Sequence, residues 1–410
     1  MTQTLQQSIF KPAAAEPLVP GQVLAHASKI LFITHFAIGD FAYMQSCFRA
    51  LKRAWPGLDI HIWVDERRRT ADATQWPHLQ KYGVYDWVNA SPWVDKCYDR
   101  TWSPALNAAS IAEAKGEDYP VIVVLTNLDS HRYARLARTI SSRAFIVGLR
   151  KVTTRSFNIV RRLGYRQLNA VIPLHKSVTY SESGAHISDI YADWFARAFG
   201  IAIPRSERFP DVDIPPVWME YAHQQFASWG FDDGSPAPVI FVNTFSKCID
   251  RCWPLERAFE LIQEMRRDAK WQDARFIVNV VPEELERARR LHAASGLAGT
   301  QLFSANQHFF QLPAILRLCS LIVTVETVVM HLANAVGVPV IAFMRQTTPE
   351  WKPIDSDNSA IIVTKEFGDW LDRLEIAEVV ETVKTRGGMY LDHSRQVDFE
   401  GRPGMGPQDA

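Results

Sequence analysis

The fold of this 410-residue chain is decided by two stretches of sequence, LFITHFAIGD at residues 31–40 and LIVTVETVVMHLANA at residues 321–335. Each begins as an apolar strand, passes through a short polar turn and continues with the residue spacing of a helix. Such units are typical of open parallel sheets, in which ligands bind at the carboxyl ends of the strands. One unit in each half predicts an α/β protein with two doubly wound domains that face each other across a cleft.

Length and composition agree with two domains. A chain of 410 residues exceeds what one hydrophobic core usually supports. Lys and Arg total 45, as do Asp and Glu, so the net charge gives no reason to expect nucleic acid as a partner. Five cysteines without a disulfide-like spacing indicate a reducing compartment, and we expect a cytoplasmic protein without a signal peptide. No apolar run approaches the roughly 20 residues of a membrane span.

Short apolar runs alternate with amphipathic segments from residue 29 onward, which predicts β-α units. In the first half the predicted strands are residues 30–34, 60–64, 121–125 and 144–147, with a helix whose buried face is Met44, Cys47, Phe48, Leu51 and Trp55. In the second half the predicted strands are residues 239–243, 275–280, 321–325, 338–343 and 360–363. Helices are predicted at residues 218–229, 255–267, 283–294, 312–319, 329–336 and 376–385.

These elements predict a domain organisation. The first domain is expected at residues 29–205, and the second at residues 238–370. The stretch between them, 206–237, contains Pro210, Pro215 and Pro216 and is interpreted as a linker. Residues 1–28 and 395–410 are expected to be disordered tails. Residues 371–394 are expected to form a C-terminal helix that packs back toward the first domain.

Gly39 and Asp40 lie where the first strand gives way to a helix. Glycine permits a close approach of ligand to backbone. The aspartate is either a helix cap or a carboxylate directed into the cleft. In the second role it would act as a general base that removes a proton from an attacking hydroxyl, a role that contributes about 10²- to 10⁴-fold to rate.

The segment that follows strand 239–243 is rich in anion-binding groups. Thr244, Ser246 and Lys247 come directly after the strand, and Arg251 precedes a predicted helix. Hydroxyls, cations and backbone N–H groups near a helix start favour a diphosphate site. The alternative is a solvated loop in which Arg251 pairs with a nearby carboxylate such as Glu256. The C-x3-C pair of Cys248 and Cys252 is too weak a signal for a metal, and we expect none.

A third polar turn follows strand 321–325. Glu326 and Thr327 are placed at its end, and His331 lies one turn into the next helix. These residues add a carboxylate, a hydroxyl and helix N-terminal amides to the same sheet edge. His331 taken alone could equally cap the helix or pack in the core.

Basic residues concentrate in one part of the first half. Residues 131–176 contain no Asp or Glu and include nine arginines and two lysines: Arg132, Arg135, Arg138, Arg143, Arg150, Arg155, Arg161, Arg162, Arg166, Lys151 and Lys176. In a chain without net charge, this region would attract an anionic partner. An anionic saccharide, a phospholipid headgroup or an acidic polymer would satisfy it, as would a merely solvated surface.

Taken together, the three motifs resemble glycosyltransferase family 9, the ADP-heptose:lipopolysaccharide heptosyltransferases, over roughly residues 29–390. The family's opening Gly-Asp before an amphipathic helix is matched by Gly39-Asp40. Its basic residue before Trp-Pro is matched by Arg251-Cys252-Trp253-Pro254, and its late Asp-Thr-Gly motif with a following His by Glu326-Thr327-Val328 and His331. The sequence departs from the late motif at two positions, with Glu326 in place of Asp and Val328 in place of Gly.

The resemblance implies a GT-B fold with two Rossmann-like domains and inverting, metal-independent transfer of a sugar, without a cofactor. The donor would be ADP-heptose or another nucleoside-diphosphate sugar, and the acceptor an anionic glycan or lipopolysaccharide-core glycolipid, reached by peripheral contact with the inner membrane. Asp40 would be the base. The donor would be held by Thr244, Ser246, Lys247, Arg251, Glu283, Glu326, Thr327 and His331. The acceptor would be bound by Gly39, Arg143, Arg150, Lys151 and Arg155.

Two other functions stay open at this point. The first is a GT-B protein that binds a nucleotide sugar, or acts as a scaffold, without turnover, because the β-branched Val328 stands where a backbone amide would meet phosphate. The second is a GT-B nucleotide-sugar epimerase, which would need no separate acceptor and has little use for a basic first domain.

Overall fold

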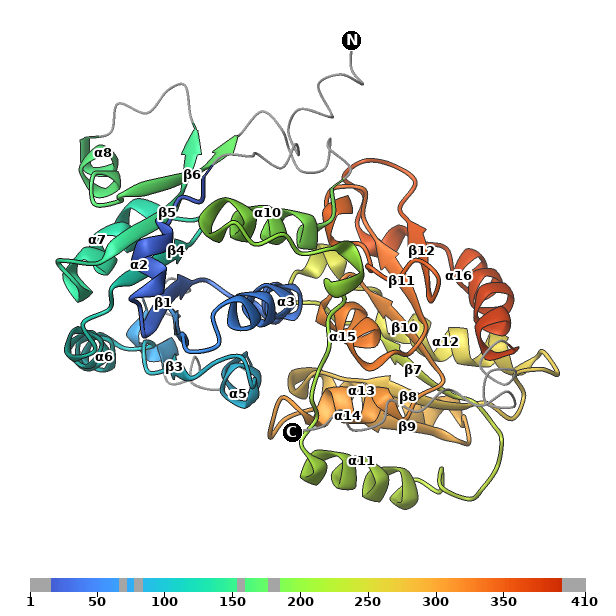
Figure 1. Cartoon of the computed structure of the whole chain (residues 1–410). Coiled ribbons are helices and arrows are strands. Elements are labelled where there is room, and N and C mark those ends of the chain that lie inside the picture. The colour runs from blue at the N-terminus through green and yellow to red at the C-terminus, as the bar shows by residue number, and fades with distance from the viewer. Residues whose placement is uncertain (1–15, 66–71, 77–83, 153–158, 176–184, 393–410) are drawn as a thin grey trace, which may run out of the picture. The chain divides into compact units, whose positions relative to one another are not determined.

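The computed structural model describes residues 16–65, 72–76, 84–152, 159–175 and 185–392. The chain divides into two compact units, residues 1–213 and 214–410 (Figure 1). The boundary falls inside the stretch interpreted as a linker, 206–237. The domain limits proposed from sequence stay predictions.

The first unit contains a six-stranded parallel sheet. Its strand order is β3-β2-β1-β4-β5-β6. The strands are β1 (Lys29–Thr34), β2 (Asp59–Val64), β3 (Lys96–Tyr98), β4 (Val121–Leu125), β5 (Phe145–Val152) and β6 (Ala170–His175). The four strands predicted in this half are confirmed as β1, β2, β4 and β5, whereas β3 and β6 were not predicted.

Helices cover both faces of this sheet. They are α2 (Gly21–Ala25), α3 (Ile38–Ala54), α5 (Val84–Ala90), α6 (Pro104–Gly116), α7 (Ser130–Ile140), α8 (Ile159–Tyr165) and α10 (Ile187–Phe199). Strand β1 shows why its sequence is continuously apolar. Leu31 and Ile33 join the core cluster that includes residues of α6 and α7, whereas the ring of Phe32 packs against Phe48 of α3 and Phe195 of α10. A strand buried on both faces needs apolar residues at every position.

The N-terminal tail predicted for residues 1–28 is wrong in its second half. Val19 is fully buried, and its backbone N–H donates to Ala198 at the end of α10, with a distance of 3.0 Å. Helix α2 follows and buries Leu24. Apolar residues scattered among Pro and Ala are therefore enough to attach this segment to the first unit. Residues 1–15 and 395–410 lie outside the described part of the chain.

The second unit repeats the same sheet. Its strand order is β12-β11-β10-β7-β8-β9, and every pair is parallel. The strands are β7 (Val239–Asn243), β8 (Arg275–Asn279), β9 (Thr300–Phe303), β10 (Leu321–Val325), β11 (Val340–Met344) and β12 (Ser359–Val363). All five strands predicted here are confirmed, and β9 was not predicted.

The helices of the second unit form two groups, one with α12, α13 and α16 and the other with α11, α14 and α15. They are α11 (Pro216–Ser228), α12 (Leu255–Arg266), α13 (Leu285–Ser295), α14 (Gln311–Arg317), α15 (Val328–Val336) and α16 (Ile376–Thr382). Val379 of α16 and Val383 of the π-helical turn η8 (Val383–Gly387) belong to the main core of this unit. The packing of residues 371–394 against the first domain stays a prediction.

Both sheets have the strand order of a doubly wound fold, with a reversal of winding between β1 and β4 and between β7 and β10. The predicted α/β class is thus confirmed. Within the residues that the structure describes, no helix combines the length and the apolar character needed to cross a bilayer.

Candidate active site

Two of the three polar turns predicted from sequence meet at one edge of the second sheet. Strands β7 and β10 are neighbours at the point where the winding reverses. The loop after β7 carries Thr244 to Arg251, and the turn after β10 carries Glu326 and Thr327. In open α/β sheets this is the position at which ligands bind.

The buried side-chain amide of Asn243 links the carboxyl ends of β7, β8 and β10 by hydrogen bonds. The Nδ2 group of Asn243, the last residue of β7, donates to Thr324 Oγ1 of β10 and to the carbonyl of Phe245, both at 3.0 Å. The Nδ2 group of Asn279, the last residue of β8, donates to Asn243 Oδ1 at 2.8 Å. Because a buried polar group is costly unless it is hydrogen bonded, this network fixes the positions from which the site loops depart.

The loop after β7 folds back on itself. The N–H of Trp253 donates to the carbonyl of Thr244 at 2.9 Å, and the Trp253 ring is buried against Phe343 of β11, with ring centroids 5.1 Å apart. Ser246 Oγ donates to the carbonyl of Glu326 at 3.2 Å, which ties the loop to the turn after β10. Lys247 is exposed beside it.

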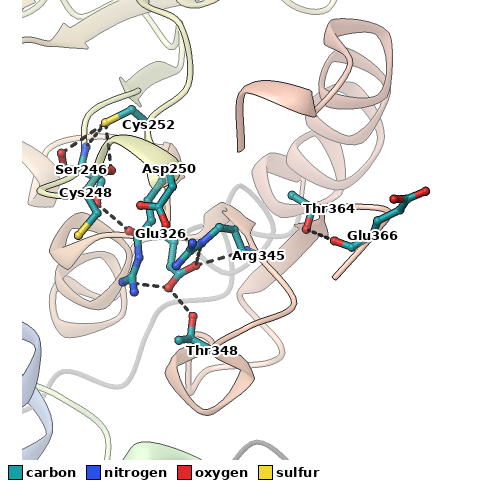
Figure 2. Close-up of polar contacts among 10 residues, drawn as sticks. Ser246, Cys248, Asp250, Cys252, Glu326, Arg345, Thr348, Thr364 and Glu366 are labelled. Atoms are coloured by element: carbon teal, nitrogen blue, oxygen red, sulfur yellow. Dashed lines mark hydrogen bonds and ion pairs between the residues drawn. The ribbon is translucent and has the colours of Figure 1, made fainter. Parts of the chain in front are cut away.

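Four charged side chains form the centre of the site, here called the Glu326 cluster: Asp250, Arg251, Glu326 and Arg345. Glu326 is only 2% exposed, and its Oε1 lies 3.0 Å from Arg251 Nη1. Its Oε2 lies 3.7 Å from Arg345 Nε and accepts the backbone N–H of Arg345 at 3.3 Å. Arg345 also pairs with Asp250. Figure 2 shows Arg345 between Asp250 and Glu326.

The Glu326 cluster has no net charge, because two guanidinium groups face two carboxylates. The hydroxyl of Thr348 adds a donor to Glu326 Oε1 at 2.5 Å, so this carboxylate is almost fully coordinated by protein. Arg251 does pair with a carboxylate, as the alternative expected, but the partner is Glu326 and not Glu256, which pairs with Arg287 at 2.6 Å. A single buried carboxylate therefore orients both guanidinium groups.

Arg345 was missed by the sequence analysis. It directly follows β11, and its position after a predicted apolar strand was the signal that could have identified it. Its side chain is mostly buried, and a buried arginine is normally paired. Thr348, which lies three residues further on, was missed for the same reason.

Several buried polar atoms after the carboxyl ends of the strands of the second sheet have no hydrogen-bond partner within the described chain. They are Thr244 Oγ1, Arg251 Nε, Ser304 Oγ, Arg345 Nε and Thr347 Oγ1. All five belong to residues that follow the carboxyl ends of β7, β9 and β11. Since native structures leave few such atoms unsatisfied, their concentration at one sheet edge favours a polar ligand there.

The turn after β10 accommodates valine without strain. Thr327 precedes α15 in an extended conformation, and Val328 is the first residue of the helix. Among the described residues other than glycine, only Asp118 and Asp129 have a left-handed backbone, so Val328 does not. His331 is buried in the first turns of α15, with its ring 5.8 Å from that of Trp351.

The expected contact of Glu283 with the donor is less well defined. Glu283 and Glu284 lie in a single 3-10 turn, η5 (Pro282–Glu284), after β8. Glu284 pairs with Arg287 at 3.0 Å, and Glu283 is exposed. The role of Glu283 stays a prediction.

In the first unit, Asp40 is held by two donors. Strand β1 ends at Thr34 and α3 begins at Ile38, which confirms the predicted strand, turn and helix. One carboxylate oxygen of Asp40 accepts the N–H of Ala37 at 2.8 Å. The other accepts the hydroxyl of Tyr191, from α10, at 2.5 Å. Asp40 thus caps the helix while staying half-exposed, and Gly39 is half-exposed beside it.

Of the basic residues proposed for the acceptor, the two whose side chains are described lie at opposite ends of β5. Arg150 is exposed near the carboxyl end of β5, whereas Arg143 precedes β5 at the opposite sheet edge, about 20 Å away along an extended chain. The side chain of Lys151 is not described, and Arg155 lies outside the described residues. Arg138 donates to the backbone carbonyls of residues 142, 144 and 167, so its role is structural.

Metal binding finds no support in this part of the molecule. In the described ranges, no group of three or more His, Cys, Asp or Glu side chains is placed to hold a metal ion. Cys252 Sγ instead accepts the N–H of Ser246 at 3.2 Å. Transfer without a metal stays a prediction.

Comparison with known proteins gives a consistent result. The family model for glycosyltransferase family 9 (heptosyltransferase) matches residues 152–373, more than half of the chain. No curated protein sequence matches the chain.

Solved structures match over nearly the whole chain. The glycosyl transferase family 9 structure from Veillonella parvula DSM 2008 has a TM-score of 0.65 at 16% identity and covers 89% of this chain and 97% of its own. The E. coli ADP-heptose LPS heptosyltransferase II has a TM-score of 0.61 at 19% identity, over 90% and 99%. E. coli heptosyltransferase WaaC with ADP has a TM-score of 0.57 at 18% identity, over 87% and 99%. At these identities the structures establish the fold, which is GT-B.

Proposed function

This chain belongs to glycosyltransferase family 9, the heptosyltransferase family, and from that premise we propose that it moves a sugar from a nucleoside-diphosphate sugar to an anionic glycan or lipopolysaccharide-core acceptor. The donor we propose is ADP-heptose, since the similar structure of E. coli WaaC contains ADP. The reaction would take place in the cytoplasm, at the inner face of the membrane that holds a lipid-linked acceptor.

One observation carries the proposal. Two guanidinium groups, those of Arg251 and Arg345, are held at the switch point of the second sheet, where phosphate groups are commonly bound. Arg251 retains a partly exposed guanidinium, and the first amides of α15 follow Thr327. Positive charge and helix N-terminal amides together stabilise the charge that develops on a departing diphosphate.

The substitution of Glu326 for the family's Asp has a physical consequence in this arrangement. The longer side chain engages Arg251 and Arg345 at once and neutralises the cluster together with Asp250. A diphosphate must then compete with Glu326 for Arg251. We therefore propose that donor affinity in this chain is limited by that competition, and that Thr244, Ser246, Lys247, Thr327 and His331 supply the remaining contacts.

In the proposed reaction, Asp40 accepts the proton of the acceptor hydroxyl. The oxygen of that hydroxyl forms a bond to the anomeric carbon of the donor sugar from the face opposite the diphosphate. The bond between that carbon and the phosphate oxygen breaks, and its electron pair leaves with the nucleoside diphosphate. Configuration at the anomeric carbon is inverted. Tyr191, which donates to one oxygen of Asp40, would keep the carboxylate correctly oriented.

Calorimetry tests the nucleotide site directly. We expect one of ADP, UDP and GDP to bind the full chain, with ADP preferred. Arg251→Ala should weaken that binding by about 1.5–3 kcal/mol, the range for hydrogen bonds to charged groups. The variant also leaves the cluster with two carboxylates and one guanidinium, which opposes an anion.

The matched control is Arg267→Ala, which removes an exposed arginine at the end of α12 whose partner among the described residues is Glu264. Its affinity should equal that of the parent. Equal affinity in Arg251→Ala would place the diphosphate elsewhere, and no binding of any nucleotide by the parent would favour the scaffold function. Release of nucleoside diphosphate only when acceptor is added would argue against an epimerase.

Thiol labelling gives a second, independent prediction. Burial raises the pKa of the Cys47 thiol to about 12 and raises the pKa of Cys97, Cys252 and Cys319 as well. A raised pKa lowers the fraction of reactive thiolate at a given pH. Cys248 is exposed in the loop after β7. We expect Ellman's reagent to label Cys248 first near pH 8, and a bound nucleotide to slow this labelling.

Cys248→Ser should abolish the fast phase and serves as the control for its assignment. A fast phase that persists in this variant, or that ADP leaves unchanged at saturating concentration, would contradict the assignment of the loop to the donor site.

A further inference from the structure

The exposed apolar side chains of the first unit are concentrated around one helix. Leu128, just before α7, is 55% exposed, and Ile159, Val160 and Leu163 of α8 are 72%, 54% and 48% exposed. Among the described residues of this unit, the one other large apolar side chain classed as exposed is that of Phe209. Single exposed apolar residues are ordinary, but a contiguous group marks an interaction site.

The packing of α7 and α8 brings these side chains to one region. Helix α8 lies beside α7 (Figure 1). A Cβ atom at Gly164 would lie 2.8 Å from His131 Cβ, and the rings of His131 and Tyr165 are 6.1 Å apart. The end of α8 therefore touches the start of α7, and Leu163 and Leu128 are close in sequence to this contact.

Arginines surround the apolar group. Five of them are exposed on the two helices and the turn that follows α8: Arg132, Arg135, Arg161, Arg162 and Arg166. The one nearby acid in sequence, Asp129, lies 3.5 Å from Arg132. Asp129 is the one acidic residue in the sequence from 128 to 166, so this stretch of the chain is strongly basic. Arg138 is not counted among the five, because it donates to backbone carbonyls.

We propose that Leu128, Ile159, Val160 and Leu163, with the arginines around them, dock the first unit on a bilayer that contains anionic lipid. A helix with apolar side chains between cationic groups binds at the membrane interface, where the apolar groups enter the acyl boundary and the cations meet anionic headgroups. A soluble anionic polymer would satisfy the arginines but would leave the apolar side chains in water. The docking does not depend on the proposed turnover.

Sedimentation of the full chain with lipid vesicles tests the docking. We expect the parent to sediment with vesicles of phosphatidylcholine containing about one third phosphatidylglycerol and to stay in solution with pure phosphatidylcholine. The triple variant Ile159→Ser, Val160→Ser, Leu163→Ser should lower the partition coefficient about tenfold or more, because the apolar contribution is removed. The double variant Arg161→Gln, Arg162→Gln should lower the partition coefficient by about tenfold. Added salt should weaken the binding of the parent to vesicles.

The control carries Phe367→Ser and Met389→Ser, which alter two exposed apolar side chains of the second unit. It should sediment like the parent. Thermal unfolding checks that each variant is folded. If the triple variant is unfolded, the double arginine variant tests the docking in its place.

Three outcomes would overturn the proposal: no sedimentation of the parent, equal sedimentation with pure phosphatidylcholine, or parent-like sedimentation of both α8 variants. Binding of the parent to polyglutamate but not to vesicles would assign the surface to a soluble polymer and would also overturn it. Nucleotide binding by the same variants reports on the proposed function separately.

Discussion

Asp40→Asn is expected to lower kcat for sugar transfer by about 10²-fold or more while donor binding stays close to that of the parent. Asparagine keeps an oxygen that can accept the N–H of Ala37, and its amide can donate to the Tyr191 oxygen, so these two hydrogen bonds have substitutes. What the variant loses is the ability to take up a proton. Initial rates with saturating donor, together with calorimetry of nucleotide binding, separate the two effects.

A suitable control is Asp59→Asn at the start of β2. Its carboxylate is exposed and lies 3.9 Å from Lys52, so the change should leave both kcat and donor affinity unaltered. If Asp40→Asn turned over like the parent, Asp40 would be a helix cap alone, and the base would have to be sought among the other residues of the first unit.

Arg345→Ala is expected to lower the free energy of unfolding of the second unit by about 3–5 kcal/mol, the cost of breaking a buried ion pair by removing one partner. Glu326 would keep Arg251 and Thr348, and Asp250 would lose its guanidinium partner. The retained contacts favour the lower end of this range. Urea unfolding followed by tryptophan fluorescence measures the change, with the two units treated as separate transitions.

Arg289→Ala in α13 provides the comparison, because that arginine pairs with Glu286 at the surface. Exposed pairs contribute about 0–1 kcal/mol, so its unfolding should resemble that of the parent. A loss below about 1 kcal/mol in Arg345→Ala would show that the Glu326 cluster is no more stabilising than a surface pair.

The sequence predicted the central strands and one edge strand, β12, but missed the three other edge strands of the two described sheets. Strands β3, β6 and β9 each pair with one neighbour only, and none was predicted. β3 has three residues, β6 contains Pro173, and β9 carries Thr300 and Gln301. Edge strands are short and tolerate polar residues and proline because one side is not paired. Central strands are buried on both faces, and this makes their apolar runs conspicuous.

Pairings across long sequence distances could not be predicted either. Position 40 was identified from its strand and turn, but its partner Tyr191 is 151 residues away on a helix that the sequence analysis did not locate. Likewise Arg251 and Glu326 were each predicted as donor-site residues, yet nothing in their separate motifs indicated that they pair with each other. A local sequence pattern predicts the strand end at which a side chain lies. The residue that it pairs with depends on the order of the strands in the sheet, which the local pattern does not contain.

Gly164 determines how closely α8 can pack against α7. Any larger residue there would collide with the backbone and Cβ of His131, neither of which can rotate away. Alanine at this position would move α8 away from α7, while every apolar and cationic side chain of the helix would be kept. The absence of one methyl group thus sets the distance between α8 and the rest of the first unit. This distance does not depend on which side chains α8 exposes.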